Sequence, residues 1–516
     1  MLVRWWKNVR MRSLVLVCLA SILERADEAL LPSVYREIGS ALDASPSALG
    51  SLTLVRSLTQ ALCAPLAGYL AQHYNRATII ACGGFMWAVA TSLVGVSGTF
   101  LEVAVSRALN GIGLAVVVPS IQSMVADATD ETNRGRGFGL LQMAGNIGGI
   151  LGGLIAVLMA DTVIFGIDGW RMSFHLVAFL SVIVAFLVYT CAIDPHFVES
   201  TSLSTKEMTF MDKLKEIWID TKNVLRVKSF QVFVAQGVAG SFPWAAMAFT
   251  AMWLELIGFS HEVTAVLMTC FVVSCSIGGL FGGWLGDYLS VKLPNTGRII
   301  LSQISAGLGV PLGAVLLLLL PSDPSTPVLY GCVFIIMGLL ISWNGPATNG
   351  PIFAEIVPEK SRTNVYALDR AFETVLASFA PPIVGLLAEN LYGYVPPPKD
   401  SSTLATDRSN AVALGKALYT STGIPFILCS LIYSLLYWTY PQDRDRVRAM
   451  SMQFQSDTDV RLEILNSTEA KHVRLEDLED VEEIEDEDNG NEQEMGRVPT
   501  HTVSETVRML HKHDEP

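Results

Sequence analysis

Ionisable side chains inside long apolar stretches are the residues of this sequence most able to do chemistry. The first such stretch carries Glu24, Arg25, Asp27 and Glu28, and the fourth carries Arg107. Charges at membrane depth are costly, so residues of this kind are usually functional. A carboxylate released from an arginine in an apolar cavity takes up a proton, and one held against the arginine releases it. The pattern therefore indicates proton transfer linked to a change of conformation.

These charges lie at one depth. Glu24 is seven residues before the end of its stretch at Leu31, and Arg107 is seven residues after the start of the fourth stretch. At about 1.5 Å per residue, both lie roughly 10 Å below the same surface, and Arg56 of the second stretch comes to a similar depth. On a helix, Glu24, Asp27 and Glu28 share one face.

Two interpretations of this charged layer remain open. In one, the ions are permanently paired and hold the helices together. In the other, Glu24 and Asp27 carry protons beside Glu28, and Arg107 tunes their proton affinity. Arg25 and Arg56 are expected to form structural ion pairs in either case.

A second charged layer is expected in the eleventh stretch. Asp369, Arg370 and Glu373 lie about two turns from its inner end. Asp369 and Glu373 are four residues apart and so share one helix face. We prefer the role of a gate latch for these residues, with contact to a solute as the alternative.

Other polar or aromatic residues in the apolar stretches are weaker candidates for a solute cavity. Asn344 and Asn349 lie in SWNGPATNGP, where two glycines and two prolines break a helix, and broken helices are tolerated where they line a cavity. Trp244 follows a proline in the seventh stretch, and Asn146 lies in the fifth. For all four, simple packing is the alternative.

The composition indicates the elements that position these residues. Of 516 residues, 51% are hydrophobic and only 16% are charged, whereas soluble domains are about 25% charged. The chain is therefore expected to be an all-α polytopic membrane protein and not a nucleic-acid binder. It has no GxxxxGK[ST], HExxH or GxSxG motif, and its eight cysteines lack CxxC spacing. No enzyme activity, metal ion or other cofactor is expected.

Twelve transmembrane helices are predicted, because each apolar stretch has about the 20 residues that cross a bilayer. They are placed at 11–31, 47–71, 78–97, 100–125, 137–160, 171–193, 230–257, 262–285, 297–320, 327–347, 363–390 and 415–439. The predicted domains are a six-helix bundle over 1–193, a central loop over 194–229, a second six-helix bundle over 230–440 and a tail over 441–516.

Lysine and arginine are concentrated on one side of these helices. Seventeen lie in the segments on the side of the N-terminus, and five lie on the other side. The positive-inside rule then predicts an integral, multi-pass protein with both termini in the cytosol.

The central loop and the tail have their own patterns. In the loop, Phe210, Leu214, Ile217, Trp218 and Leu225 follow helical spacing with lysines opposite. This predicts an amphipathic helix on the inner membrane face, with a plain linker helix as the alternative. From Pro441 on, the tail has 21 acidic and 9 basic residues, which predicts disorder. A cytosolic docking partner for the tail is a further possibility.

The two bundles show internal duplication. A shift of 227 residues lays Gly111 on Gly338, and a shift of 215 lays Gln72 on Asp287. Two pseudo-symmetric six-helix bundles around a central cavity are typical of proteins that move a solute by alternating access.

Short motifs at these positions resemble a known family. GYLAQHYNRA at 68–77 keeps the Gly68 and Arg76 of the pattern G-x-L-A-D-R-x-G-R-K, and GWLGDYL keeps its aspartate as Asp287. RALNGIG at 107–113 and GNIGGILGG at 145–153 resemble motifs of the fourth and fifth helices. Together they resemble the major facilitator superfamily over residues 1 to about 440.

The resemblance implies twelve helices in two bundles and an inner gate that includes Gly68, Gln72, Arg76 and Asp287. In the family, the carboxylate locks this gate by pairing with neighbouring helix ends. Because Gln72 has no charge, the lock of the first half is expected to be weaker.

Within the superfamily, the chain resembles plant-type members of the Spinster-like branch. The pair Glu24–Arg25, Arg107 and the segment VFVAQGVAGSFPW carry this resemblance, although Leu114 stands where Spinster proteins usually have glutamate. It implies a small organic or amphipathic, lipid-like solute.

We therefore expect a secondary active transporter that is coupled to protons, because carboxylates and arginines share the layer of the cavity. Its partners would be the solute, protons and membrane lipids. The alternatives are a passive uniporter of the same fold and a transporter-like sensor that signals through its tail.

Overall fold

The computed structural model describes residues 9–42, 46–160, 162–164, 166–194, 210–395 and 404–453. It divides the chain into two units, Met1–Arg448 and Ala449–Pro516. In the second unit, the described residues 449–453 are helical. All contacts given below lie within the first unit.

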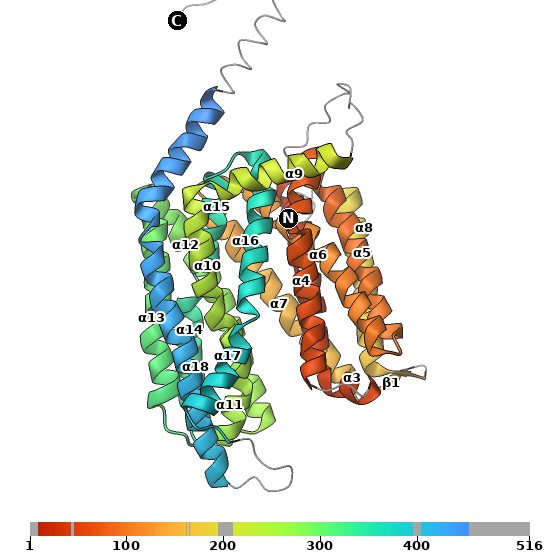
Figure 1. The fold of residues 1–516 in the computed structure, drawn as a ribbon, viewed down its shortest axis with the longest axis vertical. Helices are drawn as coiled ribbons and strands as arrows, with labels where there is room; N and C mark the ends of the chain where they lie inside the picture. The colour runs from red at the N-terminus through yellow and green to blue at the C-terminus, as the bar shows by residue number, and fades with distance from the viewer. Residues whose placement is uncertain are drawn as a thin grey trace, which may run out of the picture. The chain divides into compact units, whose positions relative to one another are not determined.

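The first half of this unit, residues 9–194, is a bundle of long helices. They are α2 (Val9–Ser33), α4 (Pro46–His73), α5 (Arg76–Val96), α6 (Phe100–Ala128), α7 (Arg134–Ala160) and α8 (Gly169–Cys191). The short helix α3 (Tyr35–Leu42) and the antiparallel strands β1 (Val163–Ile164) and β2 (Ile167–Asp168) lie at one end of it (Figure 1).

The second half, residues 228–448, lies beside the first and contains more interrupted helices (Figure 1). The first three rods are α10 (Lys228–Ala246) continued by η1 (Met247–Phe249) and α11 (Thr250–Ile257), then α12 (His261–Lys292), then α13 (Gly297–Ala314) continued by η2 (Val315–Leu319). The fourth rod is α14 (Pro327–Ile341) continued by η3 (Gly345–Asn349) and α15 (Gly350–Glu355). The fifth rod consists of η4 (Glu359–Ser361), α16 (Arg362–Ala377), α17 (Ala380–Leu386) and η5 (Leu387–Leu391), and the sixth is α18 (Leu404–Tyr433). Prolines or π-helical turns accompany most of the interruptions, as expected where intrahelical hydrogen bonds are lost.

The predicted twelve-helix architecture is confirmed. Ten helices among the described residues are long and apolar enough to cross a membrane. The other two rods are α2 and α4, which have 25 and 28 residues. Helix α18 begins at Leu404, eleven residues before the predicted start of the last span at residue 415.

The start of the predicted disordered tail also differs from the structure. The backbone is helical over residues 436–448, so order extends beyond Pro441. Asp443 accepts a hydrogen bond from the Ser229 amide at 2.8 Å, and Arg444 donates one to the Pro294 carbonyl at 3.0 Å. These contacts to the second half stabilise a segment whose composition alone would favour disorder. The acidic core of the tail lies outside the described residues.

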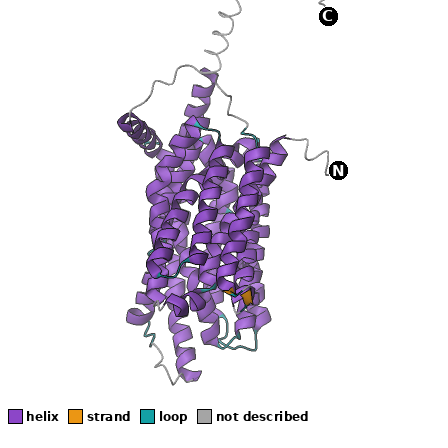
Figure 2. Ribbon diagram, turned by 90° about the vertical axis from the view of Figure 1, so that its right-hand side faces the viewer, coloured by secondary structure: helices purple, strands orange, loops and turns teal. Residues whose placement is uncertain are grey.

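Helix α9 (Phe210–Leu225) lies across the ends of the long helices, as Figure 1 shows. We call the end of the bundle where it lies the α9 end. The strands β1 and β2 lie at the opposite end, which we call the hairpin end (Figure 2). The sequence predicted that the α9 end faces the cytosol.

Glycines set the closest helix contacts. At Gly148 and Gly152 of α7, an added Cβ would lie less than 3.0 Å from the carbonyl oxygens of Ile22 and Ala26 in α2. Only glycine permits this approach of two backbones. The duplication predicted from sequence has a counterpart here, because Gly111 meets the Arg56 carbonyl and Gly338 meets the Phe271 carbonyl in the same way.

We expect Gly148→Ala to destabilise the first half. The added methyl group would force α2 away from α7, and overpacking of this kind costs about 1–3 kcal/mol. The thermal midpoint of the detergent-solubilised protein measures the effect. Gly149→Ala is the matched control, because an added Cβ there meets no atom within 4 Å. Equal midpoints for the two variants would contradict the proposed packing role.

Candidate functional site: a charged cluster and a closed gate

A cluster of ion pairs occupies the first half where it faces the second. Glu28 of α2 accepts hydrogen bonds from Arg25 at 2.8 Å and from Arg56 of α4 at 2.6 Å. Glu24 lies 3.5 Å from the Arg25 guanidinium. Glu24 and Arg56 are buried, whereas the Arg25 side chain is 43% exposed. Arg25 and Arg56 thus take the ion-pair positions expected from sequence.

Asp27 belongs to a separate network. Its carboxylate accepts hydrogen bonds from the Thr91 hydroxyl of α5 and from the Asn110 amide of α6, the latter at 3.0 Å. The Arg107 guanidinium lies 3.8 Å away, and both charged side chains are fully buried. Three helices therefore meet at one carboxylate.

The three acids of α2 do not share one environment, although the sequence placed them on one face. Glu24 and Glu28 are about 40° apart on the helix, whereas Asp27 is about 60° to the other side of Glu24. This rotation turns Asp27 toward α5 and α6 and away from the second half. Asp27 and Arg107 therefore do not line a cavity in this conformation.

The charged residues of α16 join the central cluster from the second half. Arg370 interacts electrostatically with Glu24 and Glu28, and also with Asp369 and Glu373 beside it. Asp369, Arg370 and Glu373 are all partly exposed. The sequence predicted a gate latch for these three residues. In this structure Arg370 interacts with the acids of α2, whereas Asp369 and Glu373 interact with Arg370 on their own helix.

The weaker cavity candidates are distributed over several contacts. Asn349 donates a hydrogen bond to Gln236 at 3.3 Å and accepts one from Tyr433 at 2.7 Å. Asn146 donates to Ser276 across the two halves at 3.0 Å. Trp244 is 42% exposed, and its ring centroid lies 6.2 Å from that of Phe271.

One of these candidates has a buried polar atom that makes no hydrogen bond. The side-chain oxygen of Asn344 is buried without a hydrogen-bond partner.

Among the described residues, no group of three or more His, Cys, Asp or Glu side chains is placed to hold a metal ion.

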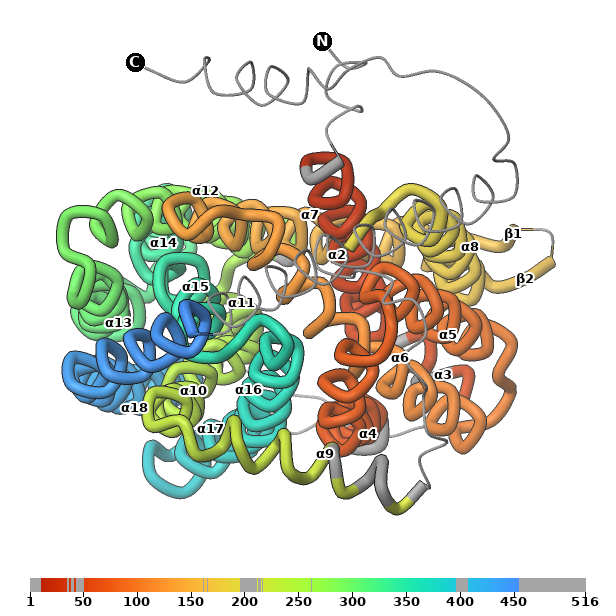
Figure 3. The backbone as a smooth tube through the Cα atoms, turned by 90° about the horizontal axis from the view of Figure 1, so that it is seen from above, coloured from red at the N-terminus to blue at the C-terminus, as the bar shows by residue number. Residues whose placement is uncertain are grey.

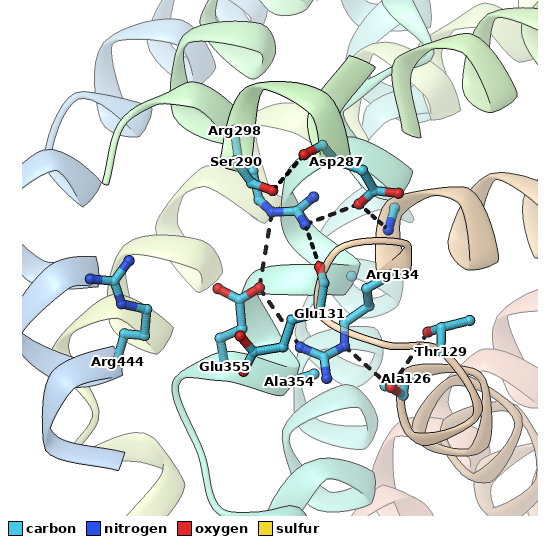
Figure 4. A network of polar contacts seen from close by, with 12 residues as sticks. Ala126, Thr129, Glu131, Arg134, Asp287, Ser290, Arg298, Ala354, Glu355 and Arg444 are labelled. Carbon is cyan, nitrogen blue, oxygen red and sulfur yellow. Dashed lines mark hydrogen bonds and ion pairs between the residues drawn. The ribbon is translucent and has the colours of Figure 1, made fainter. Parts of the chain in front are cut away.

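At the α9 end, Asp287 joins the two halves (Figure 4). This buried carboxylate of α12 accepts hydrogen bonds from the amides of Gly135 and Arg136, at 2.7 and 2.9 Å, in the first turn of α7. Arg298 donates to the same carboxylate at 3.1 Å. A negative charge at a helix N-terminus is stabilised by the unpaired amides there. Asp287 thus makes the contact to a helix end that the resemblance implied.

Two arginines cross between the halves beside Asp287. Arg134 of the first half lies 3.7 Å from Glu355 of the second, and Arg362 of the second half donates to Asp127 of the first. Each arginine also binds a carbonyl of its own half through Nε, at Ala126 for Arg134 and at Ala354 for Arg362. The crossed pairs are therefore related by the same pseudo-symmetry as the helices.

Sequence reasoning missed this arrangement, although a signal was present. Ala126-Asp127 precedes Arg134 by the same spacing as Ala354-Glu355 precedes Arg362, and a shift of 228 residues superimposes them. A search for repeated charged residues at the helix ends would have found the four partners. The pairing across halves could not have been read from the repeat, because it depends on how the two bundles face each other.

The predicted gate residues of the first half have different partners. Arg76 binds Asp127 and Asp194 within its own half. Gly68 permits α4 to approach α16, because an added Cβ would lie 2.6 Å from the Cβ of Asn364. Gln72 donates a hydrogen bond to Asp220 of α9 at 2.8 Å. The first half thus has no counterpart of the Asp287 lock, and its glutamine instead attaches α9.

The contacts between the halves indicate a conformation closed at the α9 end. There α7 packs on α12, and α4 and α6 pack on α16. The carboxylates of this gate, Asp127 and Asp287, are almost fully buried.

Comparisons with known proteins agree with this arrangement. The model of the Major Facilitator Superfamily matches residues 17–381. The chain belongs to the major facilitator superfamily. It is 24% identical to protein spinster of Drosophila melanogaster over 426 residues, which are 80% of this chain and 67% of that protein. It is also 24% identical to the quinolone resistance protein NorA of Staphylococcus aureus over 264 residues, 51% of this chain and 61% of NorA.

Solved structures share the fold of this superfamily member. A bacterial homologue of the human lysosomal transporter Spinster, in an inward-facing and unoccupied conformation, matches with a TM-score of 0.58 at 18% identity, covering 85% of this chain and 99% of that one. The proton:xylose symporter XylE matches with a TM-score of 0.60 at 17% identity, covering 82% and 95%. The chain is an integral, multi-pass membrane transporter that works by alternating access, and it is not an enzyme.

We expect Asp287→Ala to open the α9 end. The change removes the acceptor of the Gly135 and Arg136 amides and leaves Arg298 without one of its two carboxylate partners. Deuterium exchange at the first turn of α7 should then become faster by tenfold or more, since about 1.4 kcal/mol corresponds to a factor of ten. Asp168→Ala at the hairpin end is the control. Unchanged exchange in Asp287→Ala would show that this carboxylate does not hold the gate.

We expect Gln72→Asp to release α9. A second carboxylate beside Asp220 would replace a hydrogen bond by repulsion between like charges. Deuterium exchange across residues 217–225 should increase. The double change Gln72→Asp with Asp220→Asn should restore the protection, because one amide again faces one carboxylate. Failure of the second change to rescue would mean that this contact does not attach α9.

Proposed function

We propose that this transporter moves a small organic or amphipathic, lipid-like solute and couples that movement to protons. The observation that carries the proposal is the buried carboxylate of Asp27, held by Thr91, Asn110 and Arg107 from two neighbouring helices. A buried ion of this kind responds to small helix movements, because its charge is stable only while its partners stay in place.

The proposed cycle follows from these contacts. In the conformation closed at the α9 end, two hydrogen bonds and Arg107 hold the Asp27 carboxylate. A shift of α6 relative to α2 would separate the arginine and the Asn110 amide from the carboxylate. The desolvated carboxylate would then bind a proton. Proton binding and the position of α6 would thus be linked.

The solute would bind in the central cluster. Glu24 and Arg25 come from the first half, and Asp369, Arg370 and Glu373 come from the second. A solute that contacts both sets would respond to a rocking movement of the halves, as alternating access requires. The resemblance to Spinster proteins supports the solute class, and the exposed Trp244 offers an apolar contact for it.

We also propose the orientation and the moving parts. The excess of lysine and arginine near the α9 end supports a cytosolic position for that end and for both termini. The bundles 1–193 and 230–440 would move as bodies, with residues 194–229 between them. The acidic tail would then be available to a cytosolic partner.

A passive uniporter of the same fold is the second candidate. The observation that favours it is the complete burial of Asp27 and Arg107, which also suits a permanent structural ion pair. The two candidates differ in one property, because uniport does not depend on a proton gradient.

We expect Asp27→Asn to abolish solute uptake driven by a proton gradient. The amide has nearly the shape of the carboxylate but cannot exchange a proton. Uptake of a panel of solutes into proteoliposomes, with and without the gradient, measures this. Arg107→Ala should also uncouple uptake, because it removes the cationic partner of the Asp27 carboxylate.

Asp168→Asn is the matched control, because that aspartate is exposed at the hairpin end and its change should leave uptake intact. Solute exchange without a gradient should persist in Asp27→Asn if the fold is preserved. If both variants at the buried pair kept full gradient-driven uptake, proton coupling through Asp27 would be excluded and the structural interpretation would hold.

A further inference from the structure

Helix α9 presents two different faces. Thr221 and Val224 are buried against the bundle, and Asp220 is turned toward Gln72. Among the exposed residues of the helix and its last turn, five follow each other at intervals of three or four. They are Met211, Lys215, Trp218, Lys222 and Arg226. Residues at this spacing lie on one side of a helix, which we call the outer stripe.

The outer stripe combines apolar and basic side chains. Met211 and Trp218 are 68% and 65% exposed, which is a large apolar exposure for a helix of 16 residues. Three basic residues flank them. Tryptophan prefers the boundary between the lipid chains and the headgroups, and lysine and arginine stems reach from there to the phosphates. This mixture fits a bilayer surface better than water.

The position of α9 agrees with its composition. The helix crosses the ends of the spanning helices and follows the edge of the bundle, as Figures 1 and 3 show. It contacts α4, α10 and α16 at that end. A helix at the ends of membrane-spanning helices lies at the level of the lipid headgroups.

We propose that the outer stripe of α9 docks on the surface of a bilayer that contains anionic phospholipids. The basic residues Lys215, Lys222 and Arg226 supply charge complementarity to the lipid phosphates, and the exposed Trp218 and Met211 enter the boundary region. Asp220, on the same helix, is engaged by Gln72 and does not oppose the interaction.

Docking of α9 would act on the gate. The helix contacts α4 of the first half and both α10 and α16 of the second, at the end where the halves are closed. Anionic lipid that holds α9 at the surface would therefore favour one arrangement of these helices over another. The effect does not depend on which solute the transporter carries.

Fluorescence quenching in the full-length chain tests the proposal. An environment-sensitive fluorescent amino acid is encoded at position 218 or, as the control site, at exposed Asn223 on another side of α9. Each protein is placed in nanodiscs of phosphatidylcholine alone or of equal parts phosphatidylcholine and phosphatidylglycerol. Quenching by a nitroxide on the lipid headgroup is compared with quenching by iodide in water.

We expect lipid quenching at 218 to exceed that at 223 at least twofold and to rise further with phosphatidylglycerol. The double change Lys215→Glu with Lys222→Glu should remove that rise, whereas Lys292→Glu, an exposed lysine of α12, should keep it. Equal iodide quenching at 218 and 223 in both lipids would overturn the docking. A rise with phosphatidylglycerol that survives the double change would overturn the role of the stripe's charges. Size-exclusion profiles check that each variant is folded.

Discussion

The cost of a buried charge is the constraint on which this structure depends. The helices bring arginines and carboxylates into an apolar bundle, where an ion without a partner is strongly destabilising. At the α9 end, Arg134 and Arg362 satisfy this constraint by reaching across to Glu355 and Asp127. Closing the gate is therefore favourable because it pairs charges, and opening it requires that water or other groups replace those partners.

The same constraint acts at the centre with a different result. Asp27 and Arg107 are paired within one half, so their pairing survives only while α2 and α6 keep their positions. Glu24 and Arg370 come from opposite halves and interact across the space between them. One cluster is thus sensitive to movement inside a bundle, and the other to movement between bundles. A transporter that couples protons to a solute needs both kinds of sensitivity.

The two halves of the chain repeat most of the contacts at the gate, but one position differs between them. The crossed arginine pairs repeat almost unchanged, whereas the aspartate at 287 has a glutamine as its counterpart at position 72. Because glutamine cannot neutralise a helix end or an arginine, the first half lacks the second lock. That position instead donates a hydrogen bond to Asp220 of α9.

The sequence by itself determined the helix count and the duplication, and it singled out Asp287 as a residue that contacts a helix end, because hydropathy and short motifs are local properties of the chain. It also identified nearly all of the charged residues of the central cluster. Only the tertiary structure separated Asp27 from Glu24, joined Arg370 to the α2 acids and paired Arg134 with Glu355. Those partners depend on the rotation of each helix and on the facing of the two bundles, which arise from packing between segments far apart in the chain.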